Sequence, residues 1–359
     1  MIYVCNVPGL IKWDEPNQIQ NILDDLESNK NRIIGLELCH NSIGEKCAKA
    51  LGEKMKNLKN LKKVDLSDCF VTRGSGELPN CLKFLLEAIA DKPIKELYLN
   101  NNALGPTAAP GYKYFFQKNK TLEKLYLNDC GMGPIGTQIL IKIIIENKDM
   151  PLKVLKIARN KMESVGLNSI SELIKEKKSL KEIKVSDNEI NNEALNIFSE
   201  SIKSNENITL LDINNNIFGE EATILPEIVS NLKNIVHLNI SDLTLENKDI
   251  IKNVFKELPK LNNLREFFCE YNISDALGDI KKHEDKNNFI LELFESLLKI
   301  NNLKELHLEN NEIPKNIYSE YLPKFKNKGL YLFSCYADEE KMDDKNLDNE
   351  ELDMTDLNK

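Results

Sequence analysis

One pattern, LxLxxN, recurs along most of the chain and restricts the possible folds more than any other feature. It ends first at Asn41, and equivalent segments end at Cys69, Asn102, Cys130, Asn160, Asn188, Asn216, Leu243, Asn272 and Asn311. The successive intervals are 28, 33, 28, 30, 28, 28, 27, 29 and 39 residues. Alternating leucines predict a short strand with one buried face. The terminal Asn or Cys predicts a side chain that bonds backbone groups where the chain turns inward.

Amphipathic helices are predicted between these strands. Runs such as EATILPEIVSNL and NEALNIFSESIKSN carry apolar residues at spacings of three and four. One strand and one helix cannot bury their apolar faces alone, so the units must stack. A period near 28 residues lies in the range of leucine-rich repeats. We therefore expect an α/β fold, a curved leucine-rich-repeat solenoid of the ribonuclease-inhibitor-like type, with parallel strands inside and helices outside.

Three regions are expected along the chain. Residues 1–30 are predicted to form an N-terminal cap, with MIYVCNV as a first strand and EPNQIQNILDDLES as a helix that has Pro16 near its start. Residues 31–337 are predicted to form about ten repeats. Within them the polar stretch SDALGDIKKHEDKNN is interpreted as a surface loop. Residues 338–359 are rich in carboxylates and predict an acidic, disordered tail.

Composition narrows the class of partner. The net charge of −9 argues against nucleic acid and favours a protein with a basic surface. No apolar run approaches the length of a membrane span, and the first residues lack the features of a secretory signal. The eight cysteines are scattered without a CxxC pair, which is typical of reduced thiols in a cytosolic protein. His237 and His307 belong to distant repeats, so a metal site is not expected.

The segment DLSDCFVTRGSGELP interrupts the regular repeat and places Arg73 between Thr72 and Gly74. We expect this arginine to be exposed, with no intramolecular partner close in sequence. It is either an ordinary surface residue in a tolerated insertion or a guanidinium that meets phosphate or carboxylate on a partner. Asn128 and Asp129 follow a strand two repeats later, which places the two loops roughly 10 Å apart on one rim. Together they predict one site.

Four segments carry a resemblance to a known family: DLSDCFVTRGSGELP, LYLNNNALGPTAAPGYKYFFQKN, LEKLYLNDCGMGPIG and LKIARNKMES. In order and spacing they closely resemble the Ran GTPase-activating protein family, over roughly residues 31–345 and most strongly over 61–165. We also expect a monomeric, cytoplasmic protein, with a perinuclear position left open. The resemblance implies that it binds GTP-loaded Ran and stimulates GTP hydrolysis, supporting the nucleocytoplasmic transport gradient. It implies no cofactor and no catalysis of its own, because GTP and magnesium are held by the partner GTPase.

The resemblance assigns roles residue by residue. The family's loop arginine falls on Arg73. The asparagine that the family places beside the catalytic glutamine of the GTPase falls on Asp129, where this sequence departs from the pattern. An aspartate can accept a hydrogen bond from a glutamine amide but cannot donate one. Either Asp129 serves as an acceptor only, or Asn128 compensates, or the activity is reduced. The further partner-binding candidates are Asn101, Arg159 and Glu77.

Two other functional classes remain open. One is a non-catalytic leucine-rich-repeat adaptor for protein–protein interaction, since concave repeat surfaces commonly bind proteins. The other, a ribonuclease inhibitor, fits less well because the cysteine content is low and the Arg73 loop would be unexplained. Glu37 and Asp65, at exposed strand positions, are expected to attract a basic partner and raise its association rate.

Overall fold

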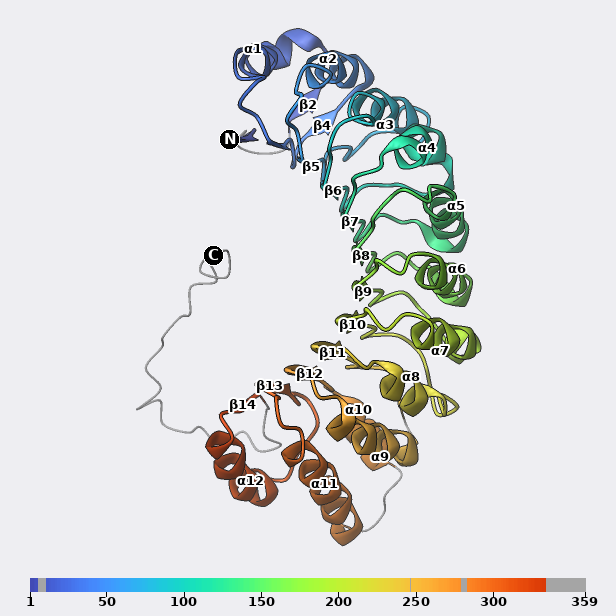
Figure 1. Ribbon diagram of the computed structural model, residues 1–359, viewed down its shortest axis with the longest axis vertical. Helices are drawn as coiled ribbons and strands as arrows, with labels where there is room; N and C mark the ends of the chain where they lie inside the picture. Colours follow the sequence, from blue (N-terminus) through green and yellow to red (C-terminus); the bar gives the residue numbers. More distant parts are fainter. Residues whose placement is uncertain (6–10, 246, 279–282, 334–359) are drawn as a thin grey trace.

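The computed structural model describes residues 1–5, 11–245, 247–278 and 283–333 as one continuous arc of repeats (Figure 1). Strands line the inner side of the arc and helices the outer side, as the repeat pattern predicts. Twelve parallel strands form one sheet in chain order, except that β2 and β4 pair separately. The sheet consists of β1 Ile2–Val4, β3 Gly35–Glu37, β5 Lys63–Asp65, β6 Glu96–Tyr98, β7 Lys124–Tyr126, β8 Val154–Lys156, β9 Glu182–Lys184, β10 Leu210–Asp212, β11 His237–Asn239, β12 Glu266–Phe268, β13 Glu305–His307 and β14 Tyr331–Phe333.

The register of the sheet stacks the middle residue of every strand on its neighbour. Leu36 pairs with Val64, and Leu97 with Leu125, and all four are fully buried. The first and third residues of each strand face the inner side of the arc. Alternation along a three-residue strand therefore separates the core from the concave surface.

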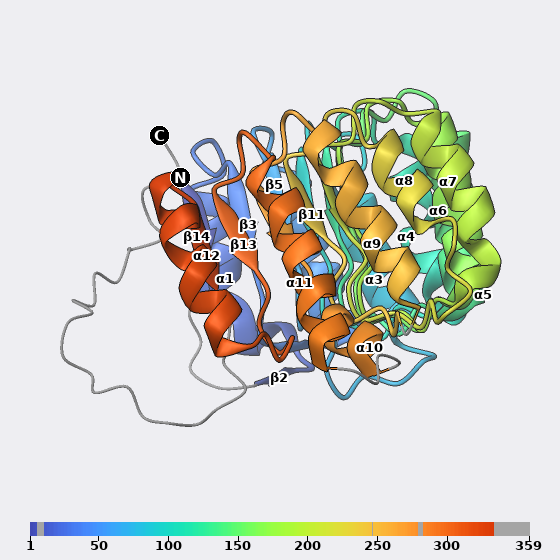
Figure 2. The same cartoon turned by 90° about the horizontal axis from the view of Figure 1, so that it is seen from below.

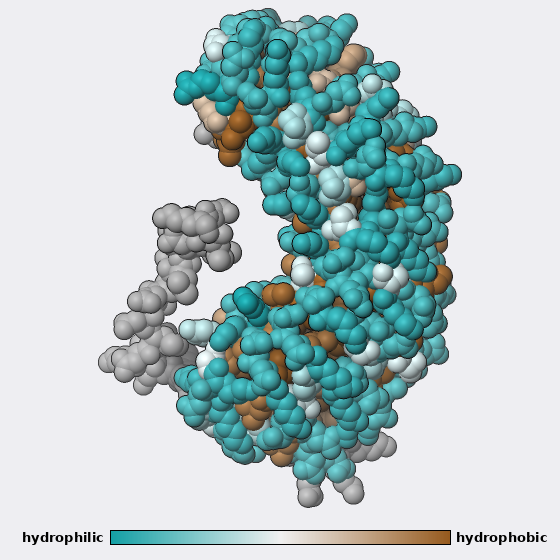
Figure 3. All heavy atoms as spheres, in the orientation of Figure 1, coloured by the Kyte–Doolittle hydropathy of each residue, from teal (hydrophilic) through white to brown (hydrophobic). Residues whose placement is uncertain are grey.

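Helices cover the other side of the sheet: α1 Gln20–Ser28, α2 Glu45–Met55, α3 Leu78–Glu87, α4 Ala109–Lys118, α5 Gly133–Glu146, α6 Glu163–Glu176, α7 Leu195–Lys203, α8 Leu225–Asn231, α9 Lys248–Glu257, α10 Asn272–Gly278, α11 His283–Leu298 and α12 Lys315–Asn327. Their inner faces close the core, and their outer faces are dominated by hydrophilic residues (Figure 3). In the described part of the chain, no helix combines the length and apolar character needed to cross a bilayer.

Where an LxLxxN segment ends in Asn or Cys, the side chain of that residue hydrogen-bonds the backbone of the turn, as predicted. The Nδ2 of buried Asn160 donates to the carbonyls of Leu127 and Ala158, both at 2.8 Å. Its Oδ1 accepts from the amides of Cys130 and Met132 at 3.1 and 3.2 Å. Where cysteine replaces asparagine, its thiol takes over one of these bonds: the Sγ of Cys130 lies 3.2 Å from the carbonyl oxygen of Leu99.

The residue before this position has a left-handed backbone in all ten repeats, with φ between 50° and 65°. These residues follow the strands at their carboxyl ends, and we call this row the carboxyl rim: His40, Asp68, Asn101, Asp129, Arg159, Asp187, Asn215, Asp242, Tyr271 and Asn310. A left-handed conformation is unfavourable for residues other than glycine, asparagine and aspartate. The repeat geometry imposes it even on Arg159 and Tyr271.

One expectation about the fold is wrong. Most of the polar stretch interpreted as a surface loop is helical, because it contributes to α10 and to the start of α11. Ile273 and Leu277 of α10 are buried, and so are Phe289 and Ile290 of α11. Of these four residues only Leu277 belongs to the quoted stretch, and the other three flank it, so the stretch by itself reads as polar. The predicted acidic tail lies outside the described residues, and the predicted region boundaries stay a prediction.

At the N-terminus, β1 extends the sheet and a second strand pair supports the first turn. In that pair β2 (Lys12–Trp13) runs parallel to β4 (Ser42–Ile43), with Trp13 buried beneath it. A 3₁₀ turn, Pro16–Ile19, then leads into α1. This arrangement places Asp14, the residue after Trp13, next to the carboxyl rim of the first repeats.

Candidate functional site: the carboxyl rim

Arg73 lies in the loop between β5 and α3, and its side chain is only 7% exposed. Its Nη1 lies 2.5 Å from Oδ1 of Asp14, and its Nη2 donates to the carbonyl of Ser42 at 2.5 Å. A second carboxylate, Glu77, is 3.5 Å from Nη1. The expectation of an exposed arginine without an intramolecular partner close in sequence is therefore wrong, because the side chain is nearly buried and Glu77 lies four residues away. The shorter contact of Arg73 is with Asp14 of the cap, 59 residues earlier, where reasoning from neighbouring residues does not reach.

The residues around Arg73 are arranged for this contact. A Cβ on Gly44 would lie 3.0 Å from the guanidinium and 3.1 Å from Asp14, so glycine makes room for the ion pair. The hydrogen bond from Arg73 lowers the pKa of Asp14 below its usual value. Arg73 thus joins the cap, the first repeat and its own loop.

Glu77, proposed from the sequence as a partner-binding residue, has intramolecular roles. Besides its ion pair with Arg73, its Oε1 accepts from the backbone amide of Glu45 at 3.1 Å. That amide lies at the start of α2, whose first turns have unpaired N–H groups and a partial positive charge. Glu77 therefore connects the Arg73 loop to the N-terminus of the preceding helix.

Asp129 and Arg159 form the second centre on the rim. Nε of Arg159 donates to Oδ2 of Asp129 at 3.0 Å, and both side chains are 53% exposed. The two residues occupy the same rim position in neighbouring repeats. The pair is open to a partner on its solvent side.

Asn128 lies beside this pair and is rigidly held. The backbone N–H of Asn128 donates to Oδ1 of Asn100 at 2.9 Å. The side-chain Oδ1 of Asn128 accepts from the backbone N–H of Ala158, also at 2.9 Å. Since a backbone amide can only donate, this contact fixes which end of the side chain is oxygen. Its Nδ2 has no hydrogen-bond partner within the described ranges. A fixed amide donor is therefore available next to Asp129.

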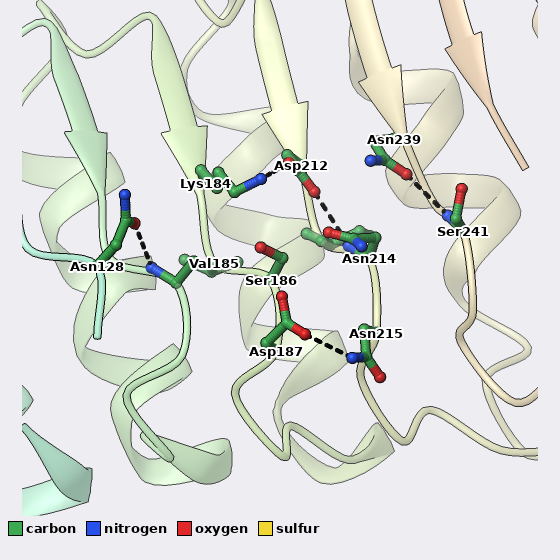
Figure 4. A network of polar contacts seen from close by, with 12 residues as sticks. Asn128, Lys184, Val185, Ser186, Asp187, Asp212, Asn214, Asn215, Asn239 and Ser241 are labelled. Atoms are coloured by element: carbon green, nitrogen blue, oxygen red, sulfur yellow. Dashed lines mark hydrogen bonds and ion pairs between the residues drawn. The ribbon is translucent and has the colours of Figure 1, made fainter. Parts of the chain in front are cut away.

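Similar polar contacts continue along the carboxyl ends of the strands (Figure 4). On the rim itself, His40 contacts Asp68 at 3.0 Å, and Asn215 donates to Asp187 at 2.5 Å. At the third strand positions Lys184 binds Asp212 at 2.6 Å. The rim thus presents carboxylates at alternate repeats.

Sequence reasoning missed this row, although its signal was present. The residue before the terminal Asn, Cys or Leu is aspartate in SDC, NDC, SDN and SDL, which are Asp68, Asp129, Asp187 and Asp242. Asn101 occupies the same row, exposed, and its backbone amide donates to the carbonyl of Asn128 at 2.9 Å.

The predicted single site separates into two centres. The guanidinium of Arg73 is directed to the cap and the first repeat, whereas Asp129 pairs with the following repeat. Across the described residues, no hydrogen bond or ion pair joins Arg73 to Asp129. The two centres lie on one rim with Asp68 and Asn101 between them.

The strand acids expected to attract a partner are already engaged. Glu37 binds Lys63 at 2.7 Å, and Asp65 accepts from the amide of Ser67 at 2.8 Å. On the concave face next to them, the rings of Tyr98 and Tyr126 stack at 4.2 Å. The exposed carboxylates of this region are therefore on the rim and not on the strands.

Two features of the described residues bear on the chemistry that the rim could support. Cys69 and Cys130, each directly after a rim residue, are buried, whereas Cys39 is half-buried. Burial raises the pKa of the Cys130 thiol to about 12 and also raises that of Cys39. Across the residues that the structure describes, no three His, Cys, Asp or Glu side chains are grouped to hold a metal. The arrangement can position and neutralise groups on a partner.

Comparison with known proteins supports the leucine-rich-repeat fold and shows which proteins the chain resembles. A leucine-rich-repeat family model matches residues 118–138. The chain is 28% identical over 177 residues to Ran GTPase-activating protein 1 of Xenopus laevis, covering 46% of this chain and 30% of that protein. It is 29% identical over 193 residues to a Ran GTPase-activating protein of Drosophila melanogaster, covering 48% and 32%.

The chain is a leucine-rich-repeat protein that resembles Ran GTPase-activating proteins. It spans about a third of the length of these curated relatives. Among solved structures, an internalin from Listeria monocytogenes matches with a TM-score of 0.43 and 14% identity, covering 88% of this chain and 89% of that one.

Proposed function

We propose that this protein is a GTPase-activating protein that binds GTP-loaded Ran through its carboxyl rim and stimulates GTP hydrolysis. The observation that carries the proposal is the fixed side chain of Asn128 beside Asp129, whose Nδ2 has no hydrogen-bond partner among the described residues. The chain that carries it resembles two Ran GTPase-activating proteins. In this proposal the protein acts as a cytoplasmic monomer and supports the gradient that drives nucleocytoplasmic transport.

The proposed mechanism is positioning of the GTPase's own glutamine. Hydrolysis by such GTPases is slow until a residue orients the attacking water. The Nδ2 of Asn128 would donate to the glutamine carbonyl, and Asp129 would accept from the glutamine amide. Two adjacent groups would then supply the donor and the acceptor that one asparagine side chain combines.

Arg73 takes a different role in this mechanism. Its guanidinium is surrounded by Asp14, the Ser42 carbonyl and Glu77. To reach a phosphate it would have to give up these contacts and leave Asp14 unpaired. We infer that Arg73 is a positioning residue, which holds the loop and the cap in the shape that docks against Ran.

A second function, a non-catalytic adaptor that binds a basic protein, is favoured by one observation. Asp129 is already paired with Arg159, so its carboxylate is less available to a glutamine. In that case the acidic rim would bind a partner without changing its chemistry.

Single-turnover hydrolysis of GTP by purified Ran, with substoichiometric amounts of this protein, separates the two functions. Strong stimulation that turns over many equivalents of Ran supports the activator. If Ran binds and its hydrolysis rate is unchanged, the adaptor is correct and the activator proposal is wrong.

A further inference from the structure

The opposite edge of the sheet has a different electrostatic character from the carboxyl rim. We call amino edge the row of residues directly before the strands β5 to β13; the two edges lie at opposite ends of the strands (Figure 2). Six of these nine residues are basic: Lys62, Lys95, Lys153, Lys181, Arg265 and Lys304. The other three are Glu123, Thr209 and Val236. A chain with net charge −9 thus concentrates positive charge along one edge.

Part of this charge is neutralised within the edge. Lys95 and Lys153 hold the two oxygens of Glu123 at 2.5 and 2.7 Å, and these bonds lower the pKa of Glu123. By contrast, Lys181 and Arg265 are exposed and form no ion pair with any residue in the described ranges. Glu266, the acid that directly follows Arg265 at the start of β12, is bound to His237 at 2.6 Å.

A depression of about 330 Å³ lies between Lys181 and Arg265. Thr209, Val236 and three asparagines, Asn207, Asn234 and Asn263, complete its lining. The asparagines are fixed: the Nδ2 of Asn207 donates to the Lys178 carbonyl and that of Asn234 to the Glu206 carbonyl, both at 2.9 Å. The floor of the depression is therefore ordered, and its two ends carry uncompensated positive charge.

The spacing of these features matches an extended peptide. Lys181 precedes β9 and Arg265 precedes β12, so three strand spacings, or about 14 Å, separate their backbones. An extended chain rises about 3.3 Å per residue, and residues i and i+4 are then about 13 Å apart on the same side. Residue i+2 would lie over Val236 and Thr209. The depression therefore fits a five-residue segment with acidic residues at its first and fifth positions and an apolar residue at its third.

The chain contains this pattern in its acidic C-terminal segment. Residues 338–359 hold ten Asp or Glu and three Lys, a net charge of −7, and they include Glu340-Lys341-Met342-Asp343-Asp344. Six residues lie between Phe333 of β14 and Glu340, and the seven steps from one to the other can span up to about 23 Å. Arg265 lies two strands from β14, or about 10 Å across the sheet, and three residues, or about 10 Å, back along the strand direction, so the connection is long enough.

We propose that the amino edge between Lys181 and Arg265 binds this chain's own acidic segment, with Glu340 at Arg265, Met342 over Val236 and Asp344 at Lys181. The segment and the carboxyl rim would then occupy opposite edges of the sheet. The contact would hold the segment on the side away from a partner bound at the rim. A long polyanion such as nucleic acid fits less well, because Glu182 and Glu266 lie beside these cations on the concave face.

Zero-length cross-linking of the full chain with a carbodiimide tests the proposal without Ran, so its outcome is independent of the proposed activity. In the monomeric fraction we expect Lys181 to be joined to Asp344 or its immediate acidic neighbours. The yield of this cross-link should exceed that of the exposed helix residue Lys113 at least fivefold, and 0.5 M salt should abolish the excess.

Two matched pairs of variants decide the register. Arg265→Glu should lower the Lys181 cross-link at least fivefold, whereas Lys113→Glu, with the same charge change on the outer helices, should leave it unchanged. The double variant Glu340→Gln with Asp344→Gln should remove the Lys181 cross-link. The control double variant, Glu350→Gln with Glu351→Gln, should keep it. Cross-links spread evenly over exposed lysines, or found only in dimers, would overturn the proposal, and so would insensitivity to Arg265→Glu.

Discussion

Two arginine–aspartate pairs lie on the same rim in very different surroundings. Arg73 pairs with Asp14 across 59 residues, and its side chain is 7% exposed. Arg159 pairs with Asp129 across 30 residues, and both side chains are 53% exposed. The first guanidinium contacts three groups from three parts of the chain, and the second contacts one group in the preceding repeat. The same residue types therefore serve architecture at one position and leave a surface available at the other.

The comparison changes how a loop arginine in a solenoid should be interpreted. An arginine between small residues in an insertion suggests a mobile side chain offered to a partner. Here the insertion instead lets the loop reach back over the first repeat, where Asp14 and the Ser42 carbonyl are in place. Asn128 and the Asp129–Arg159 pair, by contrast, keep polar groups open to a partner.

The largest effect is expected for Arg73→Ala. It removes charged hydrogen bonds from a nearly buried position, and we expect a loss of about 2–3 kcal/mol in the free energy of unfolding of the cap and first repeats. Because solenoids need not unfold in one step, hydrogen exchange at β2 and β4 is the appropriate measurement, together with urea denaturation. The stimulation of GTP hydrolysis by Ran should fall at least tenfold in the same variant.

Asp14→Asn separates the two possible roles of Arg73. If Arg73 positions the loop, the loss of Asp14 should loosen the cap and lower stimulated hydrolysis in the same direction as Arg73→Ala. If Arg73 instead reaches the phosphates, Asp14→Asn should free it and leave stimulation unchanged or higher. That second result would contradict the positioning role.

An intermediate effect is expected for Asn128→Asp. The aspartate keeps an oxygen for the amide of Ala158 but removes the Nδ2 donor, so the fold should be retained while the proposed contact to the partner's glutamine is lost. We expect stimulated hydrolysis to fall by roughly tenfold or more, in line with the loss of one positioned donor. Thermal unfolding measured in parallel serves as the control, and unchanged stimulation would mean that Asn128 is only a structural residue.

Much of the fold could be predicted from the sequence because the repeat encodes it locally. Leu125 and Leu127 define the buried face of their strand, and Asn160 satisfies the turn within reach of its own side chain. Partners that lie one repeat away can be inferred from the period, as with Asp129 and Arg159. The Arg73–Asp14 contact could not, because it depends on how the irregular cap folds over the first repeat.

The functional residues were harder to predict for a related reason. The sequence places Asn128 and Asp129 at the end of a strand, but it does not show which of Asn128's polar atoms is free. That follows from the amide of Ala158, which a neighbouring strand positions. The helical character of residues 274–278 and 283–288 was missed because the apolar residues that anchor the two helices, Ile273, Phe289 and Ile290, lie just outside that polar stretch.

The smallest effect on stability is expected for Arg159→Ala, and it tests the other half of the comparison. An exposed ion pair contributes roughly 0–1 kcal/mol because water and salt screen both charges. Losing a side chain from a left-handed position does not relieve its backbone, so the stability change should stay below about 0.5 kcal/mol in urea denaturation.

Activity should respond more than stability to Arg159→Ala, because Asp129 becomes free to accept a hydrogen bond from the partner. We expect stimulated hydrolysis to rise if Asp129 works as an acceptor, and to fall if Arg159 itself contacts Ran. A destabilisation comparable to that of Arg73→Ala would remove the distinction between the two pairs.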